Sequence, residues 1–99
     1  MRKIIDVEYI KDRQCIRYVE KISKQERLIR EIYLTYIENS IFEKLYETLI
    51  SDKVFLYNDL EYLQESGATR TAITRLRRKI GKLYRIKNIR KVGYVLVRR

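Results

Sequence analysis

Apolar residues recur every three or four positions between Gly67 and Gly81, and this spacing predicts a helix of about four turns. A glycine stands at each end, and no proline lies between them. At roughly 100° per residue, one side of this helix gathers an apolar stripe. The stripe contains Thr69, Ala72, Ile73, Leu76, Ile80 and the following Leu83. Its width predicts that the helix packs against a hydrophobic core.

The first third of the chain has the pattern of strands. Residues 4–10 alternate between apolar and polar side chains, as a strand with one buried face does. Residues 11–13 suit a turn, and residues 14–19 offer a second strand. After a polar stretch, residues 28–34 offer a third. Because a lone hairpin is only marginally stable, we expect a small antiparallel sheet within residues 1–34.

A helix is predicted from Thr35 to about Ile50. Thr35 and Glu38 form a capping box, in which the hydroxyl accepts from the backbone N–H three residues later and the carboxylate reaches back. Apolar residues then repeat at helical spacing: Ile37, Ile41, Phe42, Leu45 and Leu49. The residues expected to face outward are Glu38, Glu43, Lys44 and Glu47.

The remaining segments complete an α+β chain. Residues 54–57 read as a short strand or an extended connector, and Asn58 begins a second cap that opens a short helix ending near Gly67. Residues 84–97 have strand character, interrupted around residues 90–93, which predicts a terminal hairpin with a basic tip. The tip carries Lys87, Asn88, Arg90 and Lys91.

These elements predict one domain over residues 1–99. It contains an antiparallel sheet in residues 1–34, a three-helix core in residues 35–81 and a hairpin wing in residues 82–99. Two helices, a basic helix and a basic β-hairpin follow one another in the order of a winged helix-turn-helix domain. At 45% hydrophobic residues, the composition is that of an ordinary globular protein.

Charge is divided unevenly along the chain. Residues 66–99 contain 12 Lys and Arg and no Asp or Glu, whereas residues 1–65 contain 11 Lys and Arg against 13 Asp and Glu. The net charge of +10 is therefore the sum of −2 and +12. An asymmetry of this kind indicates a face that meets nucleic acid or an anionic membrane.

The central helix carries much of this charge on the side opposite its apolar stripe. That side presents Arg70, Thr71, Thr74, Arg75, Arg77, Arg78 and Lys82. A helix fits the major groove of B-DNA, where arginine pairs with guanine edges and threonine touches phosphates or a thymine methyl. A solvated basic face that only keeps the domain soluble is the alternative interpretation.

The sequence also argues against several kinds of chemistry. Cys15 is the only cysteine and histidine is absent, so an intrachain disulfide is excluded and a Cys/His zinc site has no ligands. We expect no catalytic residues, no metal and no cofactor, because Cys15 has no evident base and the carboxylates read as helix caps or solvated groups. Neither a membrane-spanning run nor a signal-peptide core is visible, and the cysteine content suits a reducing cytoplasm.

Three short motifs resemble a known family. They are Leu-Thr-Tyr-Ile-Glu at residues 34–38, Ile-Thr-Arg-Leu-Arg-Arg-Lys-Ile at residues 73–80 and Asn-Ile-Arg-Lys-Val-Gly-Tyr at residues 88–94. In order and spacing they are similar to the patterns Leu-Thr-x-x-Glu, Ile-x-x-Leu-Arg-x-Lys and Thr-Val-Arg-Gly-x-Gly-Tyr. These patterns belong to the effector domains of OmpR/PhoB-type response regulators in bacterial two-component systems.

The resemblance implies sequence-specific binding to double-stranded DNA as a transcriptional regulator. It places Arg70, Thr74, Arg75 and Arg77 in the major groove or on its flanking phosphates, and Asn88 and Arg90 of the wing in the adjacent minor groove. Lys91 stands where the family has glycine.

The resemblance further implies head-to-tail pairing of otherwise monomeric domains on direct repeats. It also implies contact with RNA polymerase through residues 63–67. The phosphoacceptor domain of the family is not among these 99 residues, which leaves open an excised effector domain or a stand-alone regulator.

Two other functions compete with DNA binding. A membrane-surface role is disfavoured because the apolar stripe of the basic helix has no Trp or Phe. An RNA-binding or ribosome-associated protein is the closer alternative, since tyrosines could stack on bases. Most of the nine tyrosines lie outside the basic region, and we interpret them mainly as core and sheet residues.

Overall fold

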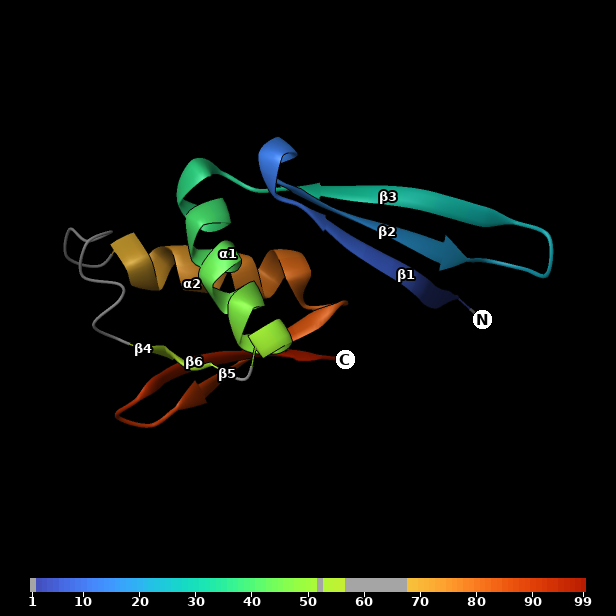
Figure 1. Cartoon of the computed structure of the whole chain (residues 1–99). Helices are drawn as coiled ribbons and strands as arrows, with labels where there is room; N and C mark the ends of the chain where they lie inside the picture. Colours follow the sequence, from blue (N-terminus) through green and yellow to red (C-terminus); the bar gives the residue numbers. More distant parts are fainter. Residues whose placement is uncertain (1, 52, 57–67) are drawn as a thin grey trace.

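The computed structural model describes residues 2–51, 53–56 and 68–99, and it shows an α+β arrangement (Figure 1). Along the chain lie β1 (Lys3–Ile10), a 3₁₀ turn (Lys11–Arg13), β2 (Cys15–Lys21), β3 (Arg27–Tyr33), α1 (Tyr36–Ser51), β4 (Phe55–Leu56), α2 (Ala68–Ile80), β5 (Tyr84–Ile89) and β6 (Gly93–Arg98). The strands form two three-stranded antiparallel sheets, with the orders β1-β2-β3 and β4-β6-β5. The predicted short helix after Asn58 falls outside the described residues.

The first sheet is a meander whose strands follow one another directly. Gln14 closes the connection between β1 and β2 in the left-handed region, with φ at 52°, and its N–H donates to the carbonyl of Lys11 at 3.0 Å. One end of the sheet buries Ile16 and Tyr18 against the helices, while the strands continue away from them (Figure 1). The predicted antiparallel sheet in the first third of the chain is thus confirmed.

The core lies between α1, α2 and the second sheet. From the two helices it takes Ile41, Phe42, Leu45, Ala72, Ile73, Leu76 and Ile80, each at most 5% exposed. From the strands and connections it takes Phe55, Leu83, Tyr84, Ile86 and Leu96. Burying each large aliphatic or aromatic side chain stabilises the fold by about 1.5–3 kcal/mol. The prediction for Ile37 is wrong, because this side chain on the first turn of α1 is 43% exposed.

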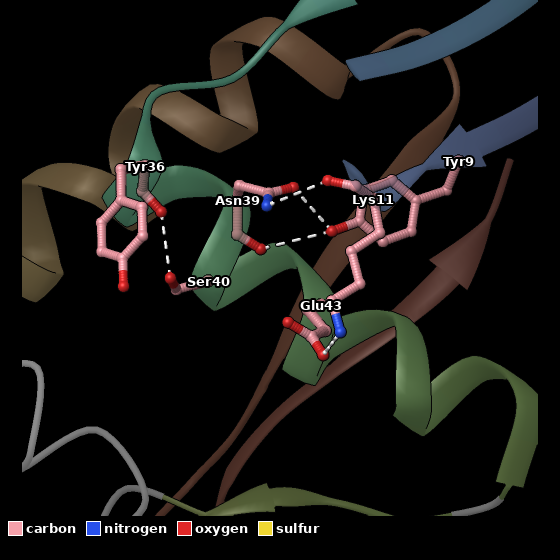
Figure 2. Close-up of polar contacts among 6 residues, drawn as sticks. All are labelled: Tyr9, Lys11, Tyr36, Asn39, Ser40 and Glu43. Carbon is pink, nitrogen blue, oxygen red and sulfur yellow. Dashed lines mark hydrogen bonds and ion pairs between the residues drawn. The ribbon is translucent and has the colours of Figure 1, made fainter. Parts of the chain in front are cut away.

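A polar cluster fixes α1 against the end of β1 (Figure 2). The Tyr9 hydroxyl donates to Asn39 Oδ1 at 2.7 Å, and Asn39 Nδ2 donates to the carbonyl of Lys11 at 3.4 Å. Lys11 Nζ lies 2.7 Å from a Glu43 carboxylate oxygen. The Tyr9 ring also packs edge-on against Phe42, with ring centroids 4.7 Å apart. Together these contacts set the angle at which α1 leaves the sheet.

A buried threonine joins α1 to the second sheet. The Thr48 hydroxyl donates to the carbonyl of Leu45 at 2.6 Å and accepts the N–H of Leu96 at 2.9 Å. The hydroxyl is therefore satisfied in the core, where an unpaired polar group would be costly. This contact holds β6, and with it the C-terminal hairpin, on α1.

Candidate nucleic-acid interface

Helix α2 has one buried face and one exposed face. Its apolar stripe lies in the core, as described above, and the residues predicted for the opposite side are all exposed: Arg70, Thr71, Thr74, Arg75, Arg77 and Arg78. The side chain of Thr69, also predicted for the stripe, lies outside the described part of the structure. Because the stripe is held by the core, the cationic face has a fixed orientation relative to the rest of the molecule.

The end of α2 is set by Gly81. A Cβ at this position would lie 2.8 Å from the carbonyl oxygen of Arg77, a distance that real Cβ atoms do not tolerate. Glycine is therefore the residue that fits this turn, in which the N–H of Leu83 donates to the carbonyl of Ile80 at 2.9 Å. Lys82 is exposed in this turn while Leu83 is buried.

After the turn, β5 runs back along α2. Arg77 Nη2 donates to the carbonyl of Ile86 at 3.4 Å, which places the last turn of the helix beside the middle of the strand. Arg77 follows Ala68 by nine positions, which is about 14 Å along a helix. Arg90 follows Ile86 by four positions, which is about 13 Å along an extended chain. The hairpin tip thus reaches the same end of the molecule as the start of α2 (Figure 1).

The hairpin tip exposes Asn88, Arg90 and Lys91. Lys91 has φ at 64°, in the left-handed region that favours glycine, and the N–H of Val92 donates to the carbonyl of Ile89 at 3.0 Å. These tip residues lie at the same end of the molecule as the start of α2 (Figure 1). Lys82 lies apart from them, at the opposite end of the helix.

The cations of this surface are not neutralised within the described residues. Seven of the predicted residues are Lys or Arg: Arg70, Arg75, Arg77, Arg78, Lys82, Arg90 and Lys91. Every salt bridge between described residues uses other cations: Arg2, Lys11, Arg13, Arg17, Arg30 and Lys79. We call these seven residues, together with Thr71, Thr74 and Asn88, the basic surface. It carries a positive field that attracts polyanions.

Two further cations lie on β5, outside the basic surface. Arg85 and Lys87 are exposed, while their neighbours Tyr84 and Ile86 are buried. Lys87, which was predicted for the hairpin tip, lies within β5. The alternation of residues 84–87 could have identified Arg85 as well, since every second side chain of a strand shares a face. Because Tyr84 and Ile86 face the core that holds α2, Arg85 and Lys87 lie on the other face of the second sheet.

Glu38 is a correction to the sequence analysis. It was expected to face outward, but it is 1% exposed and lies under α2. Lys79 Nζ donates to its Oε1 at 2.6 Å and to the carbonyl of Tyr33 at 3.0 Å. Glu38 is buried by tertiary packing, because the last turns of α2 cross the start of α1. The hydrophobic periodicity of α1 alone does not predict that crossing. Sequence reasoning also missed Lys79 as the partner.

The capping box at the start of α1 is confirmed. The backbone N–H of Thr35 donates to Glu38 Oε1 at 2.9 Å, and the N–H of Glu38 donates to Thr35 Oγ1 at 3.2 Å. Burial alone would raise the pKa of the Glu38 carboxyl, but the hydrogen bonds from Lys79 and from Thr35 outweigh it and hold the pKa below its ordinary value. Glu38 is therefore an ionised carboxylate inside the fold.

Other kinds of site find little support in the described residues. Neither described helix is long and apolar enough to cross a membrane. In residues 2–51, 53–56 and 68–99, no three His, Cys, Asp or Glu side chains are grouped as a metal ion requires. Cys15 is buried, and burial raises the pKa of its thiol, which disfavours the reactive thiolate.

Comparison with protein-family models, with curated proteins and with solved structures found no match.

Proposed function

We propose that the chain is a sequence-specific double-stranded DNA-binding domain that acts as a bacterial transcriptional regulator, with a winged helix-turn-helix fold of the OmpR/PhoB type. The observation that carries the proposal is the basic surface. Its cations have no carboxylate partners among the described residues, and they sit on a helix and a hairpin that the core holds in place. DNA phosphates supply the missing negative charge.

The dimensions of α2 suit the major groove. It has 13 residues and is about 20 Å long, and its exposed face carries arginine and threonine, which read guanine edges and thymine methyls. In this proposal Arg75 reads a base and Arg77 mainly holds a phosphate. The hairpin tip, with Asn88 and Arg90, enters the neighbouring minor groove, where a narrow groove concentrates negative potential.

Pairing is part of the proposal. One domain covers one half-site, and two domains bind head to tail on direct repeats, as the family resemblance implies. The same resemblance assigns contact with RNA polymerase to residues 63–67.

An RNA-binding or ribosome-associated role is the alternative, and one observation favours it. Tyr33 and Tyr36 expose 57% and 75% of their surfaces, and the carbonyl of Tyr33 accepts a hydrogen bond from Lys79 of α2. Exposed tyrosine rings next to a basic helix could stack on unpaired bases.

A competition experiment separates the two functions. A fluorescent duplex selected from random DNA by the protein is displaced by unlabelled duplex DNA, single-stranded RNA or hairpin RNA at equal nucleotide concentration. We expect duplex DNA to displace the probe at least about tenfold better than either RNA, because only B-form DNA has a major groove wide enough for α2. Equal or better displacement by RNA would contradict DNA binding and favour the alternative.

A matched pair of triple variants locates the surface. Arg70→Ala/Arg75→Ala/Arg78→Ala removes three cations from α2, and Lys3→Ala/Lys24→Ala/Arg27→Ala removes three from exposed positions of the first sheet and its loop. The net charge falls equally in both. We expect the first variant to lose most of the duplex affinity and the second to lose little, whereas an equal loss would mean that only net charge matters.

A further inference from the structure

A buried carboxylate oxygen in this fold lacks a partner. Glu38 is 1% exposed, and its Oε1 accepts from both Lys79 and the N–H of Thr35. Its Oε2 has no hydrogen-bond partner among the described residues. Buried polar atoms in folded proteins are nearly always paired, so an unpaired oxygen of an ionised carboxylate calls for a donor.

The donor is available across a small cavity. A space of about 230 Å³ lies between the start of α1 and α2, and its walls are Thr35, Ile37, Glu38, Thr71, Ala72 and Arg75. Arg75 is exposed and forms no hydrogen bond or salt bridge with any described residue. The residues that line the cavity therefore include Glu38, whose Oε2 has no donor, and Arg75, whose guanidinium has no acceptor among the described residues.

The helical spacing of α2 places Arg75 and Lys79 on the side of the helix that faces Glu38. Thr71, Arg75 and Lys79 stand at intervals of four residues, so they lie one above another on one stripe of the helix. Lys79 already holds Glu38 Oε1, with Nζ and Oε1 separated by 2.6 Å. Arg75 lies one turn before it and lines the same cavity as Glu38.

We propose that Glu38 is a positioning residue for Arg75, and this rests on the proposed function in duplex DNA binding. On DNA, the Arg75 guanidinium spans the cavity and donates from one edge to Glu38 Oε2. The planar fork has five N–H donors, so the remaining donors stay free to pair with the O6 and N7 of a guanine. Glu38 itself stays buried and does not touch DNA.

The charge of Glu38 also selects what Arg75 binds. A phosphate drawn to Arg75 at this cavity would lie close to an ionised carboxylate, and the two anions would repel each other. A guanine edge is uncharged and offers acceptors only. Glu38 therefore favours contact of Arg75 with a base over contact with a phosphate. It also fixes the Arg75 side chain, which otherwise loses much rotamer freedom when it binds DNA.

The test is a double-mutant cycle on the ratio of specific to non-specific duplex affinity. Glu38→Gln, Arg75→Ala and the double variant are compared with Glu43→Gln, a control that removes one carboxylate from the same helix at its contact with Lys11. We expect Arg75→Ala to reduce the ratio at least about tenfold and Glu38→Gln about five- to tenfold. We expect the double variant to match Arg75→Ala and Glu43→Gln to match the wild type.

A spectroscopic measurement on the unaltered protein keeps the test independent of folding. Nitrogen-15 NMR of the Arg75 Nε–H group should show slowed hydrogen exchange and a changed chemical shift when duplex DNA is added, while Arg27, exposed on the first sheet, shows no slowed exchange. An unchanged Arg75 signal on a duplex that binds specifically would overturn the proposal. The positioning role of Glu38 would also be overturned if Arg75→Ala reduced the ratio of specific to non-specific affinity and Glu38→Gln left that ratio unchanged. In that case the proposed function in DNA binding would survive. Absence of any specific duplex binding by the wild type would overturn both.

Discussion

At the scale of single residues, Glu38 and Lys79 link the start of α1 to the last turn of α2. The carboxylate is buried, while the side chain of Lys79 remains 35% exposed, so the pair lies at the edge of the core. Removing one partner of such a pair leaves the other charge without compensation. The contribution of the pair to stability is therefore best measured from the lysine side.

Lys79→Met should lower the free energy of unfolding by about 1–3 kcal/mol, because the Glu38 carboxylate loses its charged donor but keeps the bond from Thr35. Lys82→Met, which removes an exposed lysine one turn later, should change it by less than about 0.5 kcal/mol. Urea unfolding followed by circular dichroism measures both. Similar effects of the two variants would show that the Glu38–Lys79 pair adds nothing.

The free energy of unfolding should decrease at acid pH because the Glu38 carboxylate becomes protonated. Folding lowers the pKa of this carboxyl, so its contribution is complete above the unfolded pKa of about 4.3 and is lost as the pH falls through the folded value. Glu38→Gln should flatten this part of the curve, whereas Glu47→Gln, at an exposed position of α1, should not. Thermal unfolding between roughly pH 3 and 6 measures this dependence. An identical slope of stability against pH in Glu38→Gln and in the wild type would contradict the prediction.

The tip of the C-terminal hairpin holds a lysine in a conformation that suits glycine. Lys91→Gly should raise the free energy of unfolding by about 0.5–1 kcal/mol, because Lys91 has φ at 64° and a side chain disfavours that region. Lys87→Gly, within β5, should lower it by a similar amount, since glycine weakens a strand interior. Urea unfolding of both variants provides the measurement. Destabilisation by Lys91→Gly would mean that the chain entropy of glycine outweighs the relief of strain.

At the scale of elements, α2 was predicted within one residue of its ends, Ala68 and Ile80. The helix is strongly amphipathic and a glycine stands beyond each end, so its own sequence is enough to determine where it begins and ends. The burial of Glu38 and the exposure of Ile37 could not be predicted in the same way. Both depend on where α2 crosses α1, which the periodicity of either helix alone does not encode.

Arg75 and Arg77 of α2 should behave differently in DNA binding. Arg75→Ala should reduce the ratio of specific to non-specific affinity, because a bidentate arginine–guanine pair is worth about 1–3 kcal/mol of discrimination. Arg77→Ala should lower both affinities together, because a phosphate contact carries no sequence information. Fluorescence anisotropy with selected and scrambled duplexes measures both.

The contrast requires that both variants stay folded. Arg75 and Arg77 are exposed, and Arg77 makes one long hydrogen bond to β5, so we expect small effects on stability. Leu76→Ala, at a fully buried position between them, should cost about 2–5 kcal/mol. Loss of discrimination in Arg77→Ala with no loss in Arg75→Ala would reverse the two roles.

At the scale of the whole molecule, the division of charge along the chain becomes a division in space. The first sheet extends away from the helices (Figure 1), and Arg2, Arg13, Arg17 and Arg30 in or beside it pair with acidic neighbours. Among the described cations of α2 and the hairpin, only Lys79 forms a salt bridge. The charge division predicted that a basic face exists, and helical periodicity predicted which residues of α2 are exposed on it. The return of β5 along α2, which brings the hairpin tip to the same end of the molecule as the start of the helix, required the structure.

The central claim is that the basic surface binds DNA by replacing counterions on phosphates. The most direct test is the affinity for one duplex measured by fluorescence anisotropy at several salt concentrations. If four or more phosphates are neutralised, the affinity should fall about 100-fold or more between roughly 50 and 200 mM salt. An affinity that stays the same across this range would contradict the claim, because a surface that releases no counterions does not hold the DNA backbone.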